Sequence, residues 1–295
     1  MIVTVTLNPT LRVEYDAERV VPGQSNRVRR VGYAAGGRGL AVARYLHTFG
    51  HDVVAAGLAG GSAGELIKAE LARAGVSTQF TPIAAESRRV LAIADGRDGQ
   101  LTSFSEPSPY ITTEELGRLA VDYLAMLDGA TAVVLCGSLP DGMPEEIYGS
   151  FVSYATGAGV PVILEAGGSA LRYGAARGPA LVMPDADGRD GDVLTQAGGS
   201  ASVVVLAADT VRALTPAGEW QAAPVVGLVD RETVRDALVA GFVPGITLGW
   251  TWPDMLRHAA ALAGSVLPSG EADLTAYEAL LGGITVTAPA AAGAG

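Results

Sequence analysis

The residues that could do chemistry in this sequence lie in three turns, each between a predicted strand and a predicted helix. The first turn is Gly36-Gly37-Arg38-Gly39. Glycines let a ligand approach the backbone, a helix N-terminus favours anions, and an arginine can bind a phosphate or carboxylate through two hydrogen bonds. The turn therefore indicates an anion-binding site, although a tight turn with a solvated arginine has the same pattern.

The second turn, residues 137–142, reads "GSLPDG" and follows the apolar segment "AVVLC". Ligands of α/β proteins bind beyond the carboxyl ends of the strands. This turn could line such a pocket, or it could be a simple connection.

The third turn opens the segment "VDRETVRDALVAGF", residues 229–242. Asp230 is a typical helix N-cap residue. Three apolar residues recur once per turn on the face predicted to be buried: Val234, Leu238 and Phe242. Four polar residues are then predicted to face water: Arg231, Glu232, Arg235 and Asp236. Asp236 is either a solvated acid or a catalytic base at the start of a helix.

Other kinds of catalytic site find little support. The three histidines, His47, His51 and His258, have no metal-ligand spacing with cysteine or acids. No G-x-S-x-G or Walker-type phosphate loop occurs. The one cysteine, Cys136, excludes an internal disulfide and is expected to be a small buried hydrophobe. We therefore predict no metal-ligating residues.

Bulk composition excludes further classes of partner. The net charge of −11 repels nucleic acid and anionic membranes, and no apolar run is long enough to cross a bilayer. The chain opens on the strand-like "IVTVTLNP" without a basic start or a cleavage signal. We expect a cytoplasmic protein with no nucleic-acid or membrane partner.

Two patterns of secondary structure divide the chain. Helices are predicted at 113–128, 144–158, 231–243, 251–266 and 274–281. They alternate with short apolar strands, which predicts a parallel sheet covered on both faces. Two insertions instead contain short alternating segments, as in an antiparallel sheet that could act as a lid. The predicted division is a core of residues 1–10, 35–86 and 111–285, a lid of 11–34 and 87–110, and a disordered tail of 286–295.

Seven segments, taken in order, resemble the ribokinase-like family of carbohydrate kinases, often called PfkB kinases. They are most like the branch of bacterial 1-phosphofructokinase and tagatose-6-phosphate kinase. The segments are "VTLNPTLRVEY", "PGQSNRV", "AGGRGLAVAR", "GLAGGSAGELIKAELARAGV", "CGSLPDGMP", "LEAGGSALR" and "DRETVRDALVAGF". The resemblance covers about residues 1–285 and implies a ribokinase-like three-layer α/β/α sandwich with a mainly parallel sheet and a small β-sheet lid.

The resemblance also implies a reaction and its residues. In the family a sugar hydroxyl attacks the γ-phosphate of ATP, an aspartate takes the proton, backbone N–H groups at a helix start hold the phosphate, and Mg²⁺ neutralises its charge. Asp236 matches the catalytic base, and Asp230 matches the aspartate that opens the same motif. The implied substrate-binding residues are Arg12, Gly36, Gly37, Arg38, Gly39 and Arg88 or Arg89. Arg38 replaces the usual lysine of the sugar-binding turn, and Arg12 replaces a sugar-binding aspartate.

The sequence departs from the family where phosphate and nucleotide would bind. Thr233, Val234 and Arg235 replace the Gly-Ala-Gly whose N–H groups hold phosphate. Asp185 and Asp187, within "MPDAD", replace polar groups of the nucleotide and magnesium region and are candidate substitutes for them.

Three hypotheses stay open. The first is an active kinase that uses Mg²⁺, ATP and Asp236. The second is a non-catalytic relative that binds a phosphorylated metabolite, such as a sugar phosphate, through converging arginines: Arg12, Arg38, Arg88, Arg89 and Arg235. The third is a purely structural role, for example pairing through the lid with a true kinase subunit. Because the family often dimerises through its lid sheets, the resemblance also implies a homodimer through the lid. Nucleotide binding is expected only under the first.

Overall fold

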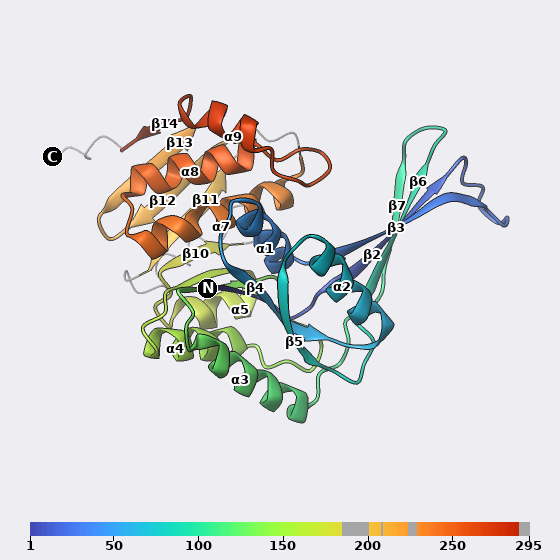
Figure 1. Ribbon diagram of the computed structural model, residues 1–295, viewed down its shortest axis with the longest axis horizontal. Helices are drawn as coiled ribbons and strands as arrows, with labels where there is room; N and C mark the ends of the chain where they lie inside the picture. Colours follow the sequence, from blue (N-terminus) through green and yellow to red (C-terminus); the bar gives the residue numbers. More distant parts are fainter. Residues whose placement is uncertain (185–200, 208, 224–228, 289–295) are drawn as a thin grey trace.

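The computed structural model describes residues 1–184, 201–207, 209–223 and 229–288, and a large sheet crosses most of the molecule (Figure 1). Its ten strands are β1 Ile2–Thr6, β4 Val53–Ala59, β5 Ser77–Pro82, β8 Ala132–Cys136, β9 Val162–Ala166, β10 Leu181–Pro184, β11 Ser202–Ala207, β12 Thr210–Thr215, β13 Gly218–Ala223 and β14 Thr285–Thr287. They lie in the order β14-β13-β12-β11-β10-β9-β8-β1-β4-β5. The pairs from β11 to β5 are parallel, and the pairs from β11 to β14 are antiparallel. The central strands β1, β8 and β9 are buried along their whole length, as expected of apolar strands covered on both faces.

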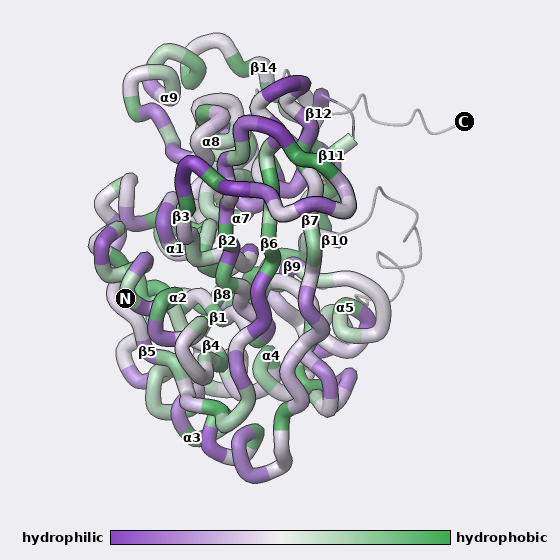
Figure 2. The backbone as a smooth tube through the Cα atoms, turned by 90° about the vertical axis from the view of Figure 1, so that its right-hand side faces the viewer, coloured by the Kyte–Doolittle hydropathy of each residue, from purple (hydrophilic) through white to green (hydrophobic). Residues whose placement is uncertain are grey.

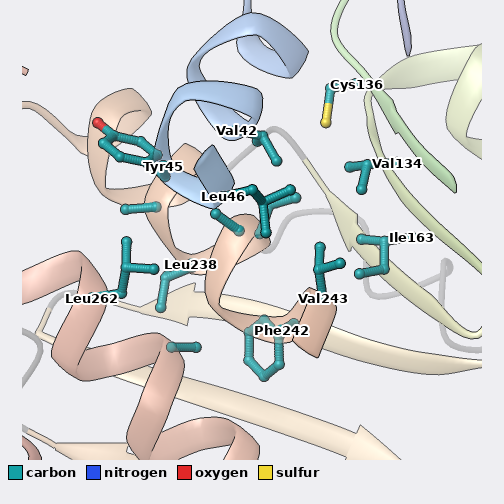
Figure 3. Packing of buried hydrophobic residues seen from close by; sticks show 14 of the residues in the cluster. Val42, Tyr45, Leu46, Val134, Cys136, Ile163, Leu238, Phe242, Val243 and Leu262 are labelled. Atoms are coloured by element: carbon teal, nitrogen blue, oxygen red, sulfur yellow. The ribbon is translucent and has the colours of Figure 1, made fainter. Parts of the chain in front are cut away.

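Helices cover both faces of this sheet. One face carries α1 Arg38–Thr48, α2 Gly61–Arg73, α7 Arg231–Leu248, α8 Trp252–Gly264 and α9 Leu274–Leu281. The other carries α3 Thr113–Leu127, α4 Ile147–Gly157 and α5 Gly168–Ala175. Figure 3 shows the first layer, where side chains of α1 and α7 pack toward Val134, Cys136 and Ile163 of the sheet and Leu262 of α8 lies beside Leu238 of α7. None of the described helices is long and apolar enough to cross a membrane.

The helix α7 corrects one prediction from the sequence. We expected Arg235 and Asp236 to face water, but they are only 6% and 8% exposed. Periodicity detects one apolar stripe, whereas α7 is covered by the sheet, by α1 and by α8, so its residues are buried continuously from Val234 to Gly245. The helix also runs beyond the expected end at residue 243 and contains Pro244.

Other helix predictions agree more closely with the structure. The prediction of 274–281 is confirmed by α9, and 113–128 differs from α3 by one residue. The helix predicted to begin at residue 144 begins at Ile147, after the turn that contains Pro144. Val286 and Thr287, which the sequence places in a disordered tail, pair with β13 as part of β14.

A small second sheet, which we call the lid after its predicted role, projects from the core (Figures 1 and 2). Its strands are β2 Thr10–Ala17, β3 Val28–Gly36, β6 Arg89–Asp95 and β7 Leu101–Ser105, in the order β3-β2-β6-β7. The sheet is mixed rather than antiparallel throughout, because β2 and β6 pair in parallel. Leu11, Val13 and Tyr15 of β2 line a pocket on the lid face that α2 adjoins.

The close approach of β4 to β1 yields a stability prediction. Gly57 has φ 143°, and a Cβ atom there would lie 1.9 Å from the carbonyl oxygen of Thr6. We expect Gly57→Ala to lower the free energy of unfolding by about 2–4 kcal/mol, since both backbone strain and a clash result. Urea denaturation measures this loss.

The matched control is Gly117→Ala on the exposed side of α3, where an added Cβ meets nothing within 4 Å. Alanine is the better helix former, so this variant should gain up to about 1 kcal/mol. Equal effects at the two glycines would contradict the steric explanation.

Candidate functional site

A row of polar side chains closes the carboxyl end of the large sheet. Thr6 of β1 is in register with Cys136 of β8, which is in register with Glu165 of β9. These residues share the sheet face covered by α1 and α7. Glu165 is fully buried at 0% exposure. The sequence analysis assigned Glu165 no role, although an acid inside the apolar strand "VILEA" is the signal that could have found it.

The glycine turn before α1 lies directly against β1. A Cβ atom at Gly37 would lie 2.8 Å from Thr6 Cγ2, and one at Gly39 would lie 2.4 Å from Thr6 Oγ1. Gly37 also has φ 131°, which few other residues adopt. Gly36 ends β3 in register with Thr10. Only glycine lets the turn lie this close to β1, and the turn places Arg38 over the strand ends.

Arg38 joins two acids from different elements. Its Nη1 atom donates a hydrogen bond to Glu165 Oε1, and its Nη2 atom lies 3.7 Å from Glu232 Oε1. The side chains are 20% exposed in Arg38, 0% in Glu165 and 77% in Glu232. The Arg38–Glu165 pair is costly to break because a buried charge would lose its partner. The Arg38–Glu232 pair contributes little to stability because Glu232 is exposed to solvent.

Asp236 lies in the second turn of α7, close enough to Arg38 for the two charges to interact. Burial raises the pKa of Asp236 to about 8, the positive charge of Arg38 opposes that rise, and Glu232 adds to it. Its Oδ1 atom has no hydrogen-bond partner among the described residues. Asp236 is therefore mainly a neutral carboxylic acid at pH 7, and one of its oxygens accepts no hydrogen bond from the described part of the chain.

Two side chains of α1 also interact with Asp236. Burial raises the pKa of Tyr45 to about 12, and Asp236 contributes to the rise. Arg44 donates a hydrogen bond of 2.8 Å to the carbonyl oxygen of Ala35, and burial lowers its pKa. The charged groups that act on Asp236 thus come from α1 and from the first turn of α7.

The start of α7 is capped by its own acid. Asp230 accepts hydrogen bonds from the Thr233 N–H at 3.0 Å and from the Thr233 hydroxyl at 2.9 Å. The Val234 N–H is bonded to the Asp230 carbonyl oxygen at 3.1 Å. Burial opposes ionisation of Asp230, but these hydrogen bonds outweigh it and lower its pKa. The backbone donors at positions 233 and 234 are therefore already used within the chain.

The structure separates the arginines that the sequence analysis grouped together. Arg12 pairs with Glu14, with Nε 3.2 Å from Oε1. Arg89 lines the pocket that adjoins α2, and it lies 3.6 Å from Glu86 and 3.8 Å from Glu106. These two arginines lie on opposite faces of the lid, since Arg12 alternates with residues of the pocket face.

Arg88 precedes β6 and alternates with Arg89, so it is directed to the face that carries Arg12. Its Nε atom is buried and has no hydrogen-bond partner among the described residues. Arg235 is buried in α7. The five arginines thus do not form a single cluster.

The turn after β8 lines the same end of the sheet. Asn8 Nδ2 donates to Ser108 Oγ at 2.8 Å and to Ser138 Oγ at 3.5 Å. The Tyr148 hydroxyl donates to the Gly137 carbonyl oxygen at 3.0 Å. Asn8 Oδ1 is buried without a partner in the described part of the chain. The turn thus meets β1 where a ligand at the strand ends would lie.

No group of three or more metal-ligating side chains occurs in the part of the chain that the structure describes. Asp185 and Asp187 lie outside the described residues. Glu165 at the end of β9 and Glu232 at the start of α7 are ion-paired with Arg38 instead of being grouped as metal ligands.

The raised pKa of Asp236 predicts a pH dependence of stability. Between the ordinary aspartate value of about 4 and about 8, the folded state keeps a proton that the unfolded state has released. Stability should therefore fall as pH rises through this window. Asp236→Asn does not titrate, so its stability relative to the parent should increase from about pH 5 to about pH 8, by at most ~1.4 kcal/mol per pH unit. Urea denaturation at both pH values tests this, and a pH-independent difference would contradict it.

Comparison with known proteins agrees with this architecture. Residues 10–188 match the model of the pfkB family carbohydrate kinases. A possible 1-phosphofructokinase from Thermotoga maritima is 24% identical, with a TM-score of 0.84 and coverage of 98% of this chain and 100% of that chain. Phosphofructokinase-2 from Escherichia coli, in its tetrameric inhibited form, is 22% identical, with a TM-score of 0.82 and coverage of 95% and 98%. These structures confirm the predicted ribokinase-like fold, and the family match confirms the resemblance: the chain belongs to the pfkB family of carbohydrate kinases.

Proposed function

We propose that this protein is an ATP-dependent sugar or sugar-phosphate kinase whose phosphoryl transfer is slow. The observation that carries the proposal is the arrangement of two acids, Asp230 and Asp236, at the start of α7. The helix holds Asp236 with a free oxygen beside Arg38, while Asp230 occupies the donors of the preceding turn. A base is present, and the anion site next to it is filled by the chain itself.

Asp236 is proposed as the general base. A carboxylate accepts the proton of a sugar hydroxyl only when it is ionised. Its pKa of about 8 makes Asp236 a stronger base than a free aspartate but leaves most molecules protonated at neutral pH. Activity limited by this group should therefore rise with pH up to about 8.

ATP with Mg²⁺ is the proposed phosphoryl donor, and the described residues fit it poorly. A phosphate at the start of α7 would compete with the Asp230 carboxylate for the Thr233 N–H, and Glu232 adds a second negative charge to this turn. Mg²⁺ would neutralise part of the phosphate charge when bound. Loss of one oxyanion donor typically costs about a hundred- to a thousandfold in rate, which supports slow transfer.

The proposed substrate is a sugar, and Arg88 is the candidate for reading a phosphate on it. Arg88 has a buried Nε atom without a hydrogen-bond partner in the described residues, whereas Arg89 pairs with acids on the other lid face. Arg12 is exposed and, among the described residues, pairs with Glu14 alone, so a ligand could displace that weak contact. The single buried cysteine, which excludes an internal disulfide, supports a reducing compartment such as the cytoplasm.

The capping of α7 also favours a second candidate, a non-catalytic relative that binds a phosphorylated metabolite. This candidate needs sugar-phosphate binding without ATP turnover. Calorimetric titration with fructose 1-phosphate and with Mg²⁺-ATP separates the two. Binding of the sugar phosphate alone would favour the non-catalytic relative.

Restoring the family's glycines should raise activity. Thr233→Gly/Val234→Ala/Arg235→Gly removes helix propensity, two crowding side chains and the bond of the Thr233 hydroxyl to Asp230, so phosphate can compete better with Asp230 for the N–H groups of this turn. We expect kcat for ADP release to rise on the order of a hundredfold. The assay uses Mg²⁺-ATP with a panel of sugars and sugar phosphates.

The control adds Asp236→Asn to the same triple variant and should remove the gained activity. Urea denaturation verifies that both variants fold. If the triple variant folds and binds ATP but gains no turnover, slow transfer has another cause and the kinase proposal fails.

We further propose that the protein forms a homodimer through the lid. The lid carries large apolar side chains that are exposed in the single chain, and three of them lie on one of its faces: Val31, Tyr33 and Phe104. Tyr33 and Phe104 also line the pocket of about 410 Å³ on the face that adjoins α2. Contiguous exposed apolar side chains of this kind are typical of protein interfaces.

Phe104→Asp tests the dimer, because an aromatic side chain in an interface pocket usually carries a large share of the affinity. The dissociation constant from analytical ultracentrifugation should rise by about tenfold or more. The control is Tyr154→Asp, which changes an exposed aromatic residue on α4, away from the lid, and should leave association unchanged. A monomeric parent protein, or an equal effect of both variants, would refute the lid interface.

A further inference from the structure

His258 is a buried titratable residue that the candidate site does not use. It lies in α8 and is 9% exposed. Its Nδ1 atom lies 2.9 Å from the carbonyl oxygen of Gly241 in α7. Because a carbonyl oxygen only accepts hydrogen bonds, Nδ1 carries the proton of the neutral imidazole. His258 therefore bonds α8 to α7 through Nδ1, and acid adds a second proton at Nε2.

Three aromatic rings from other elements surround this imidazole. Trp250, just beyond the end of α7, lies 5.2 Å from it between ring centroids, and Tyr277 of α9 lies 5.4 Å from it. Phe49 at the end of α1 lies 6.3 Å from His258 and 4.8 Å from Tyr277. All four contacts are edge-to-face, which is a favourable arrangement of aromatic rings. The four side chains form an aromatic cluster that joins α1, α7, α8 and α9.

The helix α9 has few other attachments to the core. None of its residues is fully buried, and three half-buried side chains pack against the core: Tyr277, Leu280 and Leu281. Figure 1 shows α9 at the outer edge of the molecule, next to α8. The strand β14, which follows α9 in the chain, is an edge strand of the large sheet. Segments with so little buried surface open at a lower free energy than the core.

We propose that His258 is an acid-sensitive switch for residues 274–287, the segment that comprises α9 and β14. While His258 is neutral, its ring packs against Tyr277 and holds α9 on α8. When acid protonates Nε2, the charged ring is better solvated by water than by the aromatic cluster, so α9 separates from α8. The switch depends on contacts within the chain and needs neither ATP nor sugar.

The groups near His258 favour its neutral form. Burial lowers the pKa of His258, the hydrogen bond to Gly241 opposes this effect, and His51 adds to it. Burial raises the pKa of Tyr277, and Glu278 adds to that rise. Tyr277 is therefore uncharged in acid and supplies no negative charge to the protonated ring.

No carboxylate of the described residues forms an ion pair with His258. On α8, Asp254 pairs with Arg257, with Oδ1 3.1 Å from Nη1. The helix α7 carries no charged residue from 237 to 248. On α1, His47 lies against Gly75, where an added Cβ atom would be 2.5 Å from its Nε2 atom. A proton on Nε2 of His258 thus places an uncompensated charge in the cluster, which is costly.

Hydrogen exchange with mass spectrometry measures the docking of residues 274–287. In the open segment His258 has its ordinary pKa of about 6.5, whereas its pKa in the docked form is lower. Docking should therefore weaken as pH falls below about 6.5 and stay constant above it. We expect the protection factors of residues 274–287, relative to those of α3, to fall by about three- to thirtyfold between pH 7 and pH 5. The reference to α3 removes global effects, such as the opposite titration of Asp236.

Two variants remove the titration of His258 in different ways. His258→Asn keeps a hydrogen-bond donor near the position of Nδ1, and His258→Phe keeps a ring in the aromatic cluster. Both should make the relative protection of residues 274–287 independent of pH between 7 and 5. The control is His51→Asn, which removes the neighbouring imidazole and should retain most of the parental fall.

NMR of the imidazole groups gives an independent readout in the full chain. The His258 resonance is assigned by its loss in His258→Asn, and its titration midpoint should lie below about pH 6.5. A midpoint at or above this value would overturn the inference, because the cluster would then tolerate the charged ring. The inference is also overturned if both His258 variants keep the parental fall, if His51→Asn abolishes it, or if residues 274–287 and α3 lose protection equally.

Discussion

The buried ion pair between Arg38 and Glu165 is the interaction on which the site depends. A carboxylate at 0% exposure needs a partner, and Arg38 supplies it from the start of α1. The partner reaches this position because glycines at 37 and 39 let the turn lie against Thr6. Sheet, turn and helix are thereby held at one point, and Asp236 lies beside it.

At the start of α7, burial and helix capping shift the pKa values of two aspartates in opposite directions. Desolvation keeps Asp236 protonated near neutral pH, whereas hydrogen bonds keep Asp230 ionised. The ionised acid occupies the backbone donors of the first turn, and the neutral acid holds the free oxygen. The helix begins at Arg231, so residues 233–235 lie in a first turn that Asp230 caps.

Much of the architecture follows from the sequence pattern. Apolar strands alternating with helices predict the covered parallel sheet, and α3 and α9 match the predicted ranges closely. The exposure of α7 could not be predicted, since a single helix shows its apolar stripe but not the neighbours that cover its polar side. Arg88 and Arg89 could not be distinguished from the sequence for a similar reason. Neighbouring residues of a strand point to opposite faces of the sheet, but the sequence does not say which face meets the site.

The sequence by itself determined the family, the fold class and the position of Asp236 in the motif, because these depend on the order and type of residues along the chain. Only the tertiary structure decided what surrounds Asp236. Arg38 and Glu165 are 127 positions apart and meet because the glycine turn before α1 lies against Thr6 at the carboxyl end of β1, and β9 ends at the same edge of the parallel sheet. The burial of Asp236 and the charges around it depend on residues that are distant in the sequence. The pKa and the chemical role of Asp236 are therefore set only when folding brings these residues together.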